Sequence, residues 1–135
     1  MNKLPTLLFF LFLLLNSCKQ ENITTSIASP SGVNKIEFQL MENGAPAYQV
    51  SHGNEIVIQK SNMGFDFKNA ATLDKGFTIV SSKTNTVKEF WEMPWGEQRK
   101  VSNHYNELIL QLEEAKAPNR KLNVYLRAYD DGIGF

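Results

Sequence analysis

Apolar and polar side chains alternate along much of this chain, which is the pattern of half-buried β-strands. The clearest case is the run in which Ile36, Phe38 and Leu40 are separated by charged and amide side chains. Further strands are expected within residues 48–50, 56–58, 77–80, 84–92, 108–113 and 122–129. The pattern therefore predicts an all-β fold.

The last two predicted strands, 108–113 and 122–129, are joined by Pro118-Asn119-Arg120, and we expect them to pair as a hairpin. A helix over Tyr105 to Ala117 is the alternative, because Glu, Leu and Gln are good helix formers. The matching alternation on both sides of the turn favours the hairpin.

Turn signals separate the predicted strands. Asn43-Gly44 predicts a hairpin because both residue types accept positive φ angles. His52-Gly53-Asn54 predicts the next turn, with His52 exposed, and residues 69–76 are expected to form a loop or a short turn of helix. Strands about 8 to 12 residues apart with turns between them indicate an antiparallel β-sandwich.

Asp130-Asp131-Gly132 has the chemistry of a turn, in which Asp side chains bond nearby backbone N–H groups. Ile133-Gly134-Phe135 then begins another strand. Adjacent residues of a strand point to opposite faces, so the two aspartates are not expected to act as a catalytic pair.

Residues 1–17 are typical of a bacterial lipoprotein signal peptide. Their apolar run, 7–15, is too short to span a bilayer and suits the core of a signal. Leu15-Asn16-Ser17-Cys18 has the form of a lipobox, so we expect Cys18 to be lipidated and residues 18–26 to form a polar tether. An ordinary secretory signal is the alternative. With the lipobox, we expect a cell-envelope lipoprotein that is periplasmic or anchored at the outer membrane.

Charge and cysteine content narrow the function classes further. Fourteen basic and fourteen acidic side chains balance, and no basic stripe occurs, so nucleic acid is not an expected partner. Cys18 is the single cysteine, so no intrachain disulfide is possible. Roughly 117 residues remain after the signal, which suffices for one small domain.

The stretch from Phe90 to Glu107 is not explained by strand formation alone. It holds both tryptophans, Trp91 and Trp95, and then Asn103-His104-Tyr105-Asn106-Glu107. Strands favour simple alternation rather than two carboxamides around a His-Tyr pair.

Several of these motifs together resemble a known family. Trp95-Gly96-Glu97, Asn103-His104-Tyr105-Asn106-Glu107 and the final run from Tyr129 to Phe135 resemble, in order and spacing, the N-terminal domain of glycoside hydrolase family 97. The region of Ser29-Pro30-Ser31-Gly32 agrees as well, so the resemblance covers roughly residues 27–135. Members of this family are α-glucosidases and α-galactosidases of Bacteroides-like bacteria.

The resemblance implies a supersandwich-like domain over residues 27–135, followed in family members by a catalytic (β/α)8 barrel and a C-terminal sheet domain. We expect this chain to be a C-terminally truncated fragment that lacks the barrel and is inactive alone. The domain is expected to be a carbohydrate-binding or accessory part of its parent, which would be an exo-acting, calcium-dependent hydrolase of α-linked glucose or galactose. The catalytic acids and most calcium ligands would lie beyond Phe135, so the expected partners are the barrel and an α-linked oligosaccharide.

Five residues are candidates for contact with substrate or barrel: Trp95, Glu97, His104, Asn106 and Glu107. No catalytic residue is assigned, because nothing in the chain resembles a catalytic motif of the family. No metal ligand is assigned either, since a lone histidine without a second His or Cys at ligand spacing is weak support for a metal site.

Structural roles are the alternative for these residues. Trp91 and Trp95 could offer ring faces to a sugar; the alternative is that one or both pack in the core or against another domain, because Met93-Pro94 indicates a buried corner. A buried indole N–H would then be accepted by Glu92 or Glu97. Asn103 and Asn106 would then stabilise an irregular strand end.

A second hypothesis for the function is a stand-alone, lipid-anchored sandwich that binds glycan or a protein without catalysis. This hypothesis leaves the open edge of the final strand unexplained.

Overall fold

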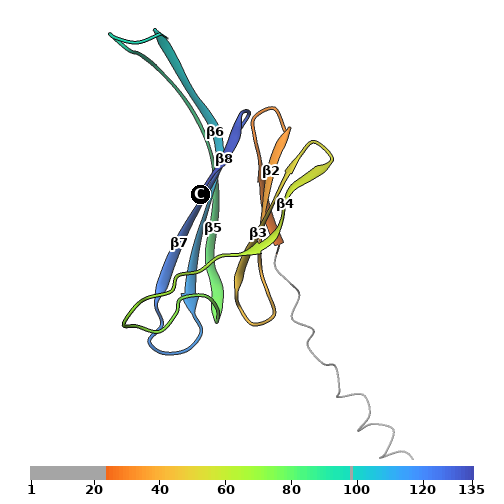
Figure 1. Ribbon diagram of the computed structural model, residues 1–135, viewed down its shortest axis with the longest axis vertical. Helices are drawn as coiled ribbons and strands as arrows, with labels where there is room; N and C mark the ends of the chain where they lie inside the picture. Colours follow the sequence, from red (N-terminus) through yellow and green to blue (C-terminus); the bar gives the residue numbers. More distant parts are fainter. Residues whose placement is uncertain (1–23, 98) are drawn as a thin grey trace, which may run out of the picture.

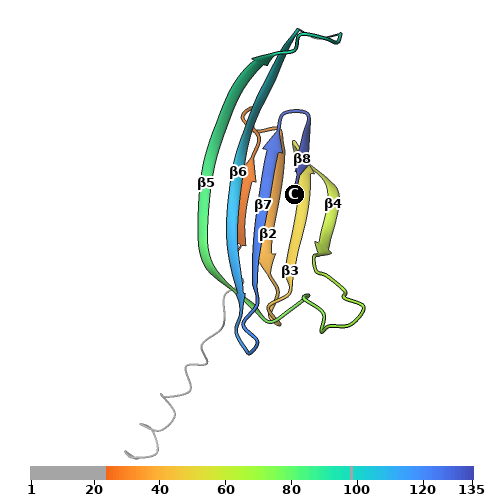
Figure 2. The same cartoon turned by 90° about the vertical axis from the view of Figure 1, so that its left-hand side faces the viewer.

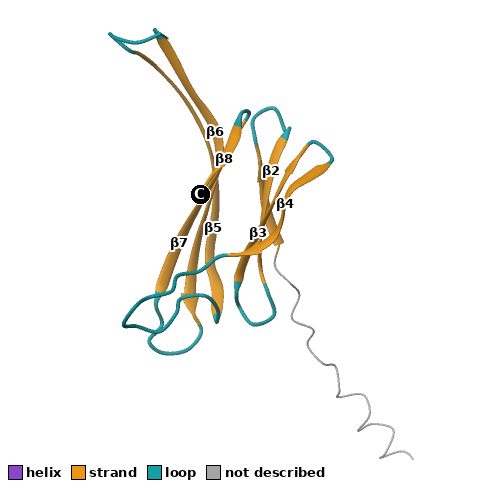
Figure 3. Ribbon diagram, in the orientation of Figure 1, coloured by secondary structure: helices purple, strands orange, loops and turns teal. Residues whose placement is uncertain are grey.

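The computed structural model describes residues 24–97 and 99–135, and this part of the chain contains strands, turns and loops but no helix (Figure 3). The expected signal peptide, Cys18 and most of the tether lie outside the described residues. Within the described ranges no helix is long and apolar enough to cross a membrane.

The first sheet is a four-stranded antiparallel meander of β1 (Thr24–Ala28), β2 (Asn34–Leu40), β3 (Pro46–His52) and β4 (Glu55–Asn62). The predicted alternation is confirmed in β2, where Ile36 and Phe38 are fully buried. The turns predicted at Asn43-Gly44 and around Gly53 connect β2 to β3 and β3 to β4.

The second sheet has the same topology and consists of β5 (Phe77–Glu92), β6 (Lys100–Glu114), β7 (Lys121–Tyr129) and β8 (Gly132–Gly134). The two segments expected at 77–80 and 84–92 form one long strand, β5. The hairpin prediction for β6 and β7 is confirmed, and the alternative helix over 105–117 is wrong. Residues 69–76 form a loop.

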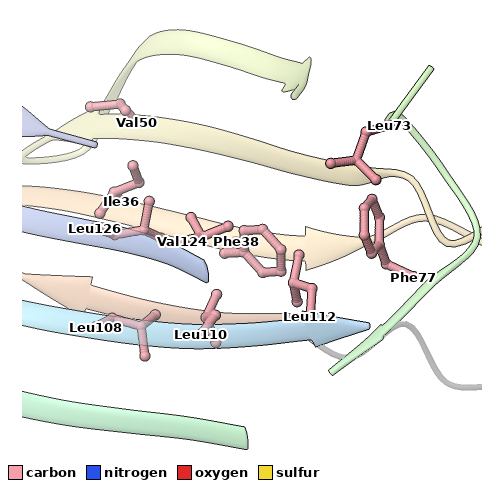
Figure 4. Close-up of a cluster of buried hydrophobic side chains, with 10 residues drawn as sticks. All are labelled: Ile36, Phe38, Val50, Leu73, Phe77, Leu108, Leu110, Leu112, Val124 and Leu126. Carbon is pink, nitrogen blue, oxygen red and sulfur yellow. The ribbon is translucent and has the colours of Figure 1, made fainter. Parts of the chain in front are cut away.

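The two sheets pack face to face around one apolar core (Figure 4), which confirms the predicted sandwich. Leu108, Leu110 and Leu126 in the second sheet are completely buried against Ile36 and Phe38 in the first. Burying each of these side chains contributes roughly 1.5–3 kcal/mol, so their regular alternation explains why the sheets associate.

The sheets are offset sideways. β1 packs over β6 and β7, and β2 packs over β7 and β8. β4 and β5 are edge strands of their sheets, and nearly every residue of both is exposed.

The far halves of β5 and β6 project beyond the sandwich as a curved arm (Figures 1 and 2). We define the arm as residues 88–104, where β6 pairs with β5 but no longer with β7. The arm bends away from the first sheet, so the outer face of the second sheet, turned away from the core, is concave (Figure 1).

Candidate functional site

The five residues that the sequence singled out do not form one site. Trp95 and Glu97 lie in the loop at the tip of the arm. His104 and Asn106 share the inner face of β6 with the core leucines, whereas Glu107 points to the outer face, because successive strand residues alternate.

Glu97 and Glu107 are too far apart to act as an acid and base pair. Between Lys100 and Glu107 the extended strand β6 covers about 23 Å, and Glu97 lies in the loop beyond Lys100. Glycoside hydrolysis requires two carboxyl groups about 5 to 9.5 Å apart. Glu97 and Glu107, the two carboxylates singled out from the sequence, therefore cannot form a catalytic pair.

The tip of the arm is exposed, so the expectation of a buried corner is wrong. Trp95 is 84% exposed, and Phe90, Trp91 and Met93 are between 44% and 67% exposed. The reason is geometric, because the arm extends past the opposite sheet. Glu92 accepts a hydrogen bond from Arg99 Nε at 3.3 Å, which gives this carboxylate a guanidinium partner.

Asn106 has a structural role inside the sandwich. Its Nδ2 donates to the carbonyl of Ala28 at 2.9 Å, and its Oδ1 accepts from Thr86 Oγ1 at 2.7 Å. It thus joins β6 to β1 and to β5. The predicted irregular strand end is wrong, since β6 pairs with β5 continuously through this region.

A polar clasp closes the sandwich at the base of the arm. The backbone N–H of Ser31 donates to Asp130 Oδ1 at 2.8 Å, and Asn34 Nδ2 donates to the carbonyls of Tyr129 and Asp130 at 2.9 and 3.0 Å. The hydrogen bond from Ser31 holds the pKa of Asp130 below its ordinary value. Asp130 therefore binds a backbone N–H of the opposite sheet, whereas the sequence predicted a local one.

His104 lies beside this clasp. With Ser102, Tyr129, Asp130 and Asp131 it lines an open hollow of about 690 Å³. The described residues include no group of three or more His, Cys, Asp or Glu side chains that could hold a metal ion. The hollow is polar, but it contains no ligand set for calcium.

The outer face of the second sheet carries an ion pair between a buried carboxylate and a half-exposed guanidinium. Glu107 is only 6% exposed, and its Oε1 accepts from Arg127 Nε at 2.8 Å. That hydrogen bond raises the pKa of Arg127 above its ordinary value. The guanidinium also lies 5.1 Å from the ring of Tyr105, which packs on Tyr129 with ring centroids 4.8 Å apart.

Sequence reasoning named Glu107 but missed Arg127, Tyr105 and Tyr129. The signal lay in the hairpin register, which pairs Glu107 with Arg127 and Tyr105 with Tyr129. Because paired residues share a face, fixing that register assigns all four to the outer face.

A second, apolar hollow lies at the opposite side of the sandwich, between the free edge of β7 and the first sheet. It measures about 510 Å³ and is lined chiefly by Tyr48, Met63, Phe65, Leu122, Val124 and Phe135. The rings of Tyr48 and Phe135 are in contact there, with centroids 4.8 Å apart.

A family model described as Glycosyl-hydrolase 97 N-terminal matches residues 27–135, the whole described sandwich apart from the start of β1. The chain belongs to this family. The resemblance stated from the sequence motifs is thereby confirmed.

Solved structures of glycoside hydrolase family 97 enzymes share the fold of this family 97 domain. One, from Pseudoalteromonas sp. strain K8 in complex with panose, has a TM-score of 0.75 and 29% identity. A family 97 enzyme from the same strain in complex with acarbose has a TM-score of 0.75 and 28% identity. Each match covers 81% of this chain and 16% of the enzyme, so this chain spans about a sixth of those relatives.

A β-arabinopyranosidase structure also has the same fold, with a TM-score of 0.68 and 20% identity over 78% of this chain and 16% of that protein. At that identity the similarity concerns the fold alone. The fold therefore occurs in enzymes with different names.

Proposed function

We propose that this family 97 domain is the N-terminal, accessory β-sandwich of a calcium-dependent, exo-acting α-glucosidase or α-galactosidase. The match of residues 27–135 to the family's N-terminal model carries this proposal, together with the 16% of the relatives' length that the chain covers. The catalytic acids would belong to another domain of the parent enzyme.

The domain's role would be to pack on the catalytic domain and shape one wall of the substrate pocket. The exposed apolar tip of the arm supports this, because Trp95, Phe90 and Met93 present an aromatic and apolar surface on a projecting element. Such residues are typical anchors of protein interfaces.

Calcium would be bound elsewhere in the parent enzyme. The described part of this chain offers no cluster of carboxylate and histidine side chains for it, and we assign it no ligand here. The ion would supply Lewis-acid polarisation and order the carboxylates of the catalytic domain.

The genomic DNA beyond the codon for Phe135 is the first test. We expect the reading frame, or a shifted frame, to continue into a catalytic domain with carboxylates at its strand ends. A stop codon with no such domain nearby would overturn the proposal and leave the stand-alone, glycan-binding or protein-binding lipoprotein.

The role of the arm tip is tested in the full-length enzyme. Trp95→Ala should weaken the domain interface by about 1–3 kcal/mol, seen as a lower Tm and faster proteolytic separation of the domains. Val80→Ala is the control, because Val80 is an exposed hydrophobic residue like Trp95 but belongs to the part of β5 away from the arm. An unchanged Tm in Trp95→Ala would contradict docking through the tip.

We also propose that Cys18 anchors the protein in the cell envelope through a lipid. Radiolabelled palmitate should enter the wild-type protein, and Cys18→Ser should abolish labelling and release the protein from the membrane fraction. Labelling that persists in Cys18→Ser would contradict this assignment.

A further inference from the structure

The outer face of the second sheet, which faces the viewer in Figure 2, bears a continuous row of aromatic and polar side chains. The register places Trp91 beside Val101, Glu89 beside Asn103, Tyr129 beside Tyr105, Arg127 beside Glu107, and Tyr125 beside Ile109. The β6 members of these pairs are every second residue from Val101 to Ile109, so they and their partners on β5 and β7 share one face of the sheet. We name six of them the outer strip: Trp91, Glu89, Asn103, Tyr129, Arg127 and Tyr125.

The outer strip has an exposed aromatic ring near each end. Trp91 and Tyr125 are both 47% exposed. Their partners on β6 are eight residues apart, which corresponds to about 26 Å along the strand. The arm bends toward this face (Figure 1), so the strands that carry the strip are curved rather than flat.

The polar groups between the two rings are held in place by the protein itself. Asn103 Nδ2 donates to Glu89 Oε2 at 3.2 Å, and Arg127 Nε donates to the buried carboxylate of Glu107 at 2.8 Å. Arg127 uses one of its five N–H donors in that bond, and Asn103 retains its carbonyl oxygen as an acceptor. The strip thus offers oriented donors and acceptors.

This combination matches the chemistry of an oligosaccharide. A pyranose ring presents C–H faces that pack on aromatic rings, and its hydroxyl groups both donate and accept hydrogen bonds. The positive charge of Arg127 is compensated by Glu107, so the strip suits an uncharged polyol better than an anion.

Charged and amide side chains alternate with the rings of the outer strip, whereas the centre of a protein interface is depleted in charged residues. We propose that the outer strip is a binding surface for an α-linked oligosaccharide. The α-linkage rests on the proposed function; the sugar-binding chemistry rests on the strip alone.

The test is titration of the chain with maltopentaose and, separately, cellopentaose, followed by tryptophan fluorescence and calorimetry. Maltopentaose should bind, and Trp91→Ala and Tyr125→Ala should each raise its Kd roughly five- to tenfold. Phe90→Ala is the matched control, because Phe90 is adjacent, is 67% exposed and points to the opposite face of β5. It should leave the Kd unchanged.

Absence of binding to both sugars would overturn the strip as a glycan site, as would equal weakening by Phe90→Ala. Binding of cellopentaose alone would support the strip but contradict the α-linkage and with it the proposed substrate class. In the full-length enzyme, burial of Trp91 against the catalytic domain, seen as loss of its quenching by acrylamide, would show that protein occupies the strip and would overturn the proposal. Circular dichroism of each variant verifies that the fold is retained.

Discussion

At the scale of single residues, a few backbone and side-chain positions connect the two sheets. Gly44 sits in the β2–β3 turn with φ of +73°, and its backbone carbonyl accepts the N–H of Phe77 at 3.0 Å. Asp130 accepts the N–H of Ser31 from the far end of the chain. Both contacts join segments that are distant in sequence.

Gly44→Ala is expected to destabilise the domain by roughly 2–4 kcal/mol, because the residue has a positive φ and an added Cβ would lie 2.6 Å from Phe77 N. Gly53→Ala separates the two causes: Gly53 has φ of +57° but open space around it, so only the cost of about 1–2 kcal/mol for the left-handed backbone applies. Chemical denaturation of both variants measures the difference. Equal losses would contradict the steric contribution at Gly44.

Asp130→Asn is expected to weaken the dependence of stability on acid pH. The folded protein lowers the pKa of Asp130 below the ordinary 3.8, so the carboxylate stabilises the fold above that pH. This contribution is lost as pH falls from about 3.8 through the lowered value. Tm measured from pH 7 to pH 2 should therefore fall less in Asp130→Asn than in wild type.

The neighbouring substitution Asp131→Asn is the control, because the hydrogen bond from Ser31 goes to Asp130. It removes an equal charge from the same turn. Parallel Tm profiles for Asp130→Asn and wild type would show that the clasp makes no pH-dependent contribution.

At the scale of elements, the edge strands determine how the domain meets other molecules. β4 is an edge strand in which Ile56, Val57 and Ile58 are 50%, 65% and 37% exposed. A register shift near this segment interrupts its pairing with β3. Exposed edge strands with apolar side chains are templates for pairing with another chain.

Val57→Lys is expected to reduce self-association of the isolated chain, because a charge on an edge strand opposes strand pairing. Light scattering over a range of protein concentrations measures this effect. Gln59→Lys is the control, since it adds the same charge to β4 without removing an apolar side chain. If both variants reduce association equally, net charge rather than the apolar edge is responsible.

The elements also show where sequence reasoning succeeds. The alternation of Leu108, Leu110 and Leu112 identified both the strand and its buried face correctly. The expectation that Met93-Pro94 marks a buried corner around Trp91 and Trp95 failed, because local sequence does not show how far a hairpin extends beyond its sheet. An aromatic side chain is buried only if another layer covers it.

At the scale of the whole molecule, the described residues form a sandwich around an apolar core, with a projecting arm and with β4 and β5 largely exposed at the sheet edges. An exposed arm and exposed edge strands are features of a domain that contacts other domains. The family 97 relatives are about six times longer than the matched region, which agrees with that shape.

Calcium removal is expected to affect the parent enzyme but not this domain. EDTA should leave the Tm of the chain unchanged, because its described residues offer no metal-binding cluster. The full-length enzyme should lose activity under the same treatment and regain it with added calcium. A fall in the Tm of the isolated chain on chelation would reveal a calcium site within it.

The sequence by itself determined the strands, most turns, the sandwich and the family, because these depend on side-chain periodicity and on local motifs. Tertiary structure alone decided which face each candidate residue occupies, how far the arm projects, and that Asp130 binds Ser31 across the sandwich. Those outcomes depend on the register between strands and the lateral offset between sheets. Both arise from packing between segments distant in sequence, which the periodicity of one strand does not encode.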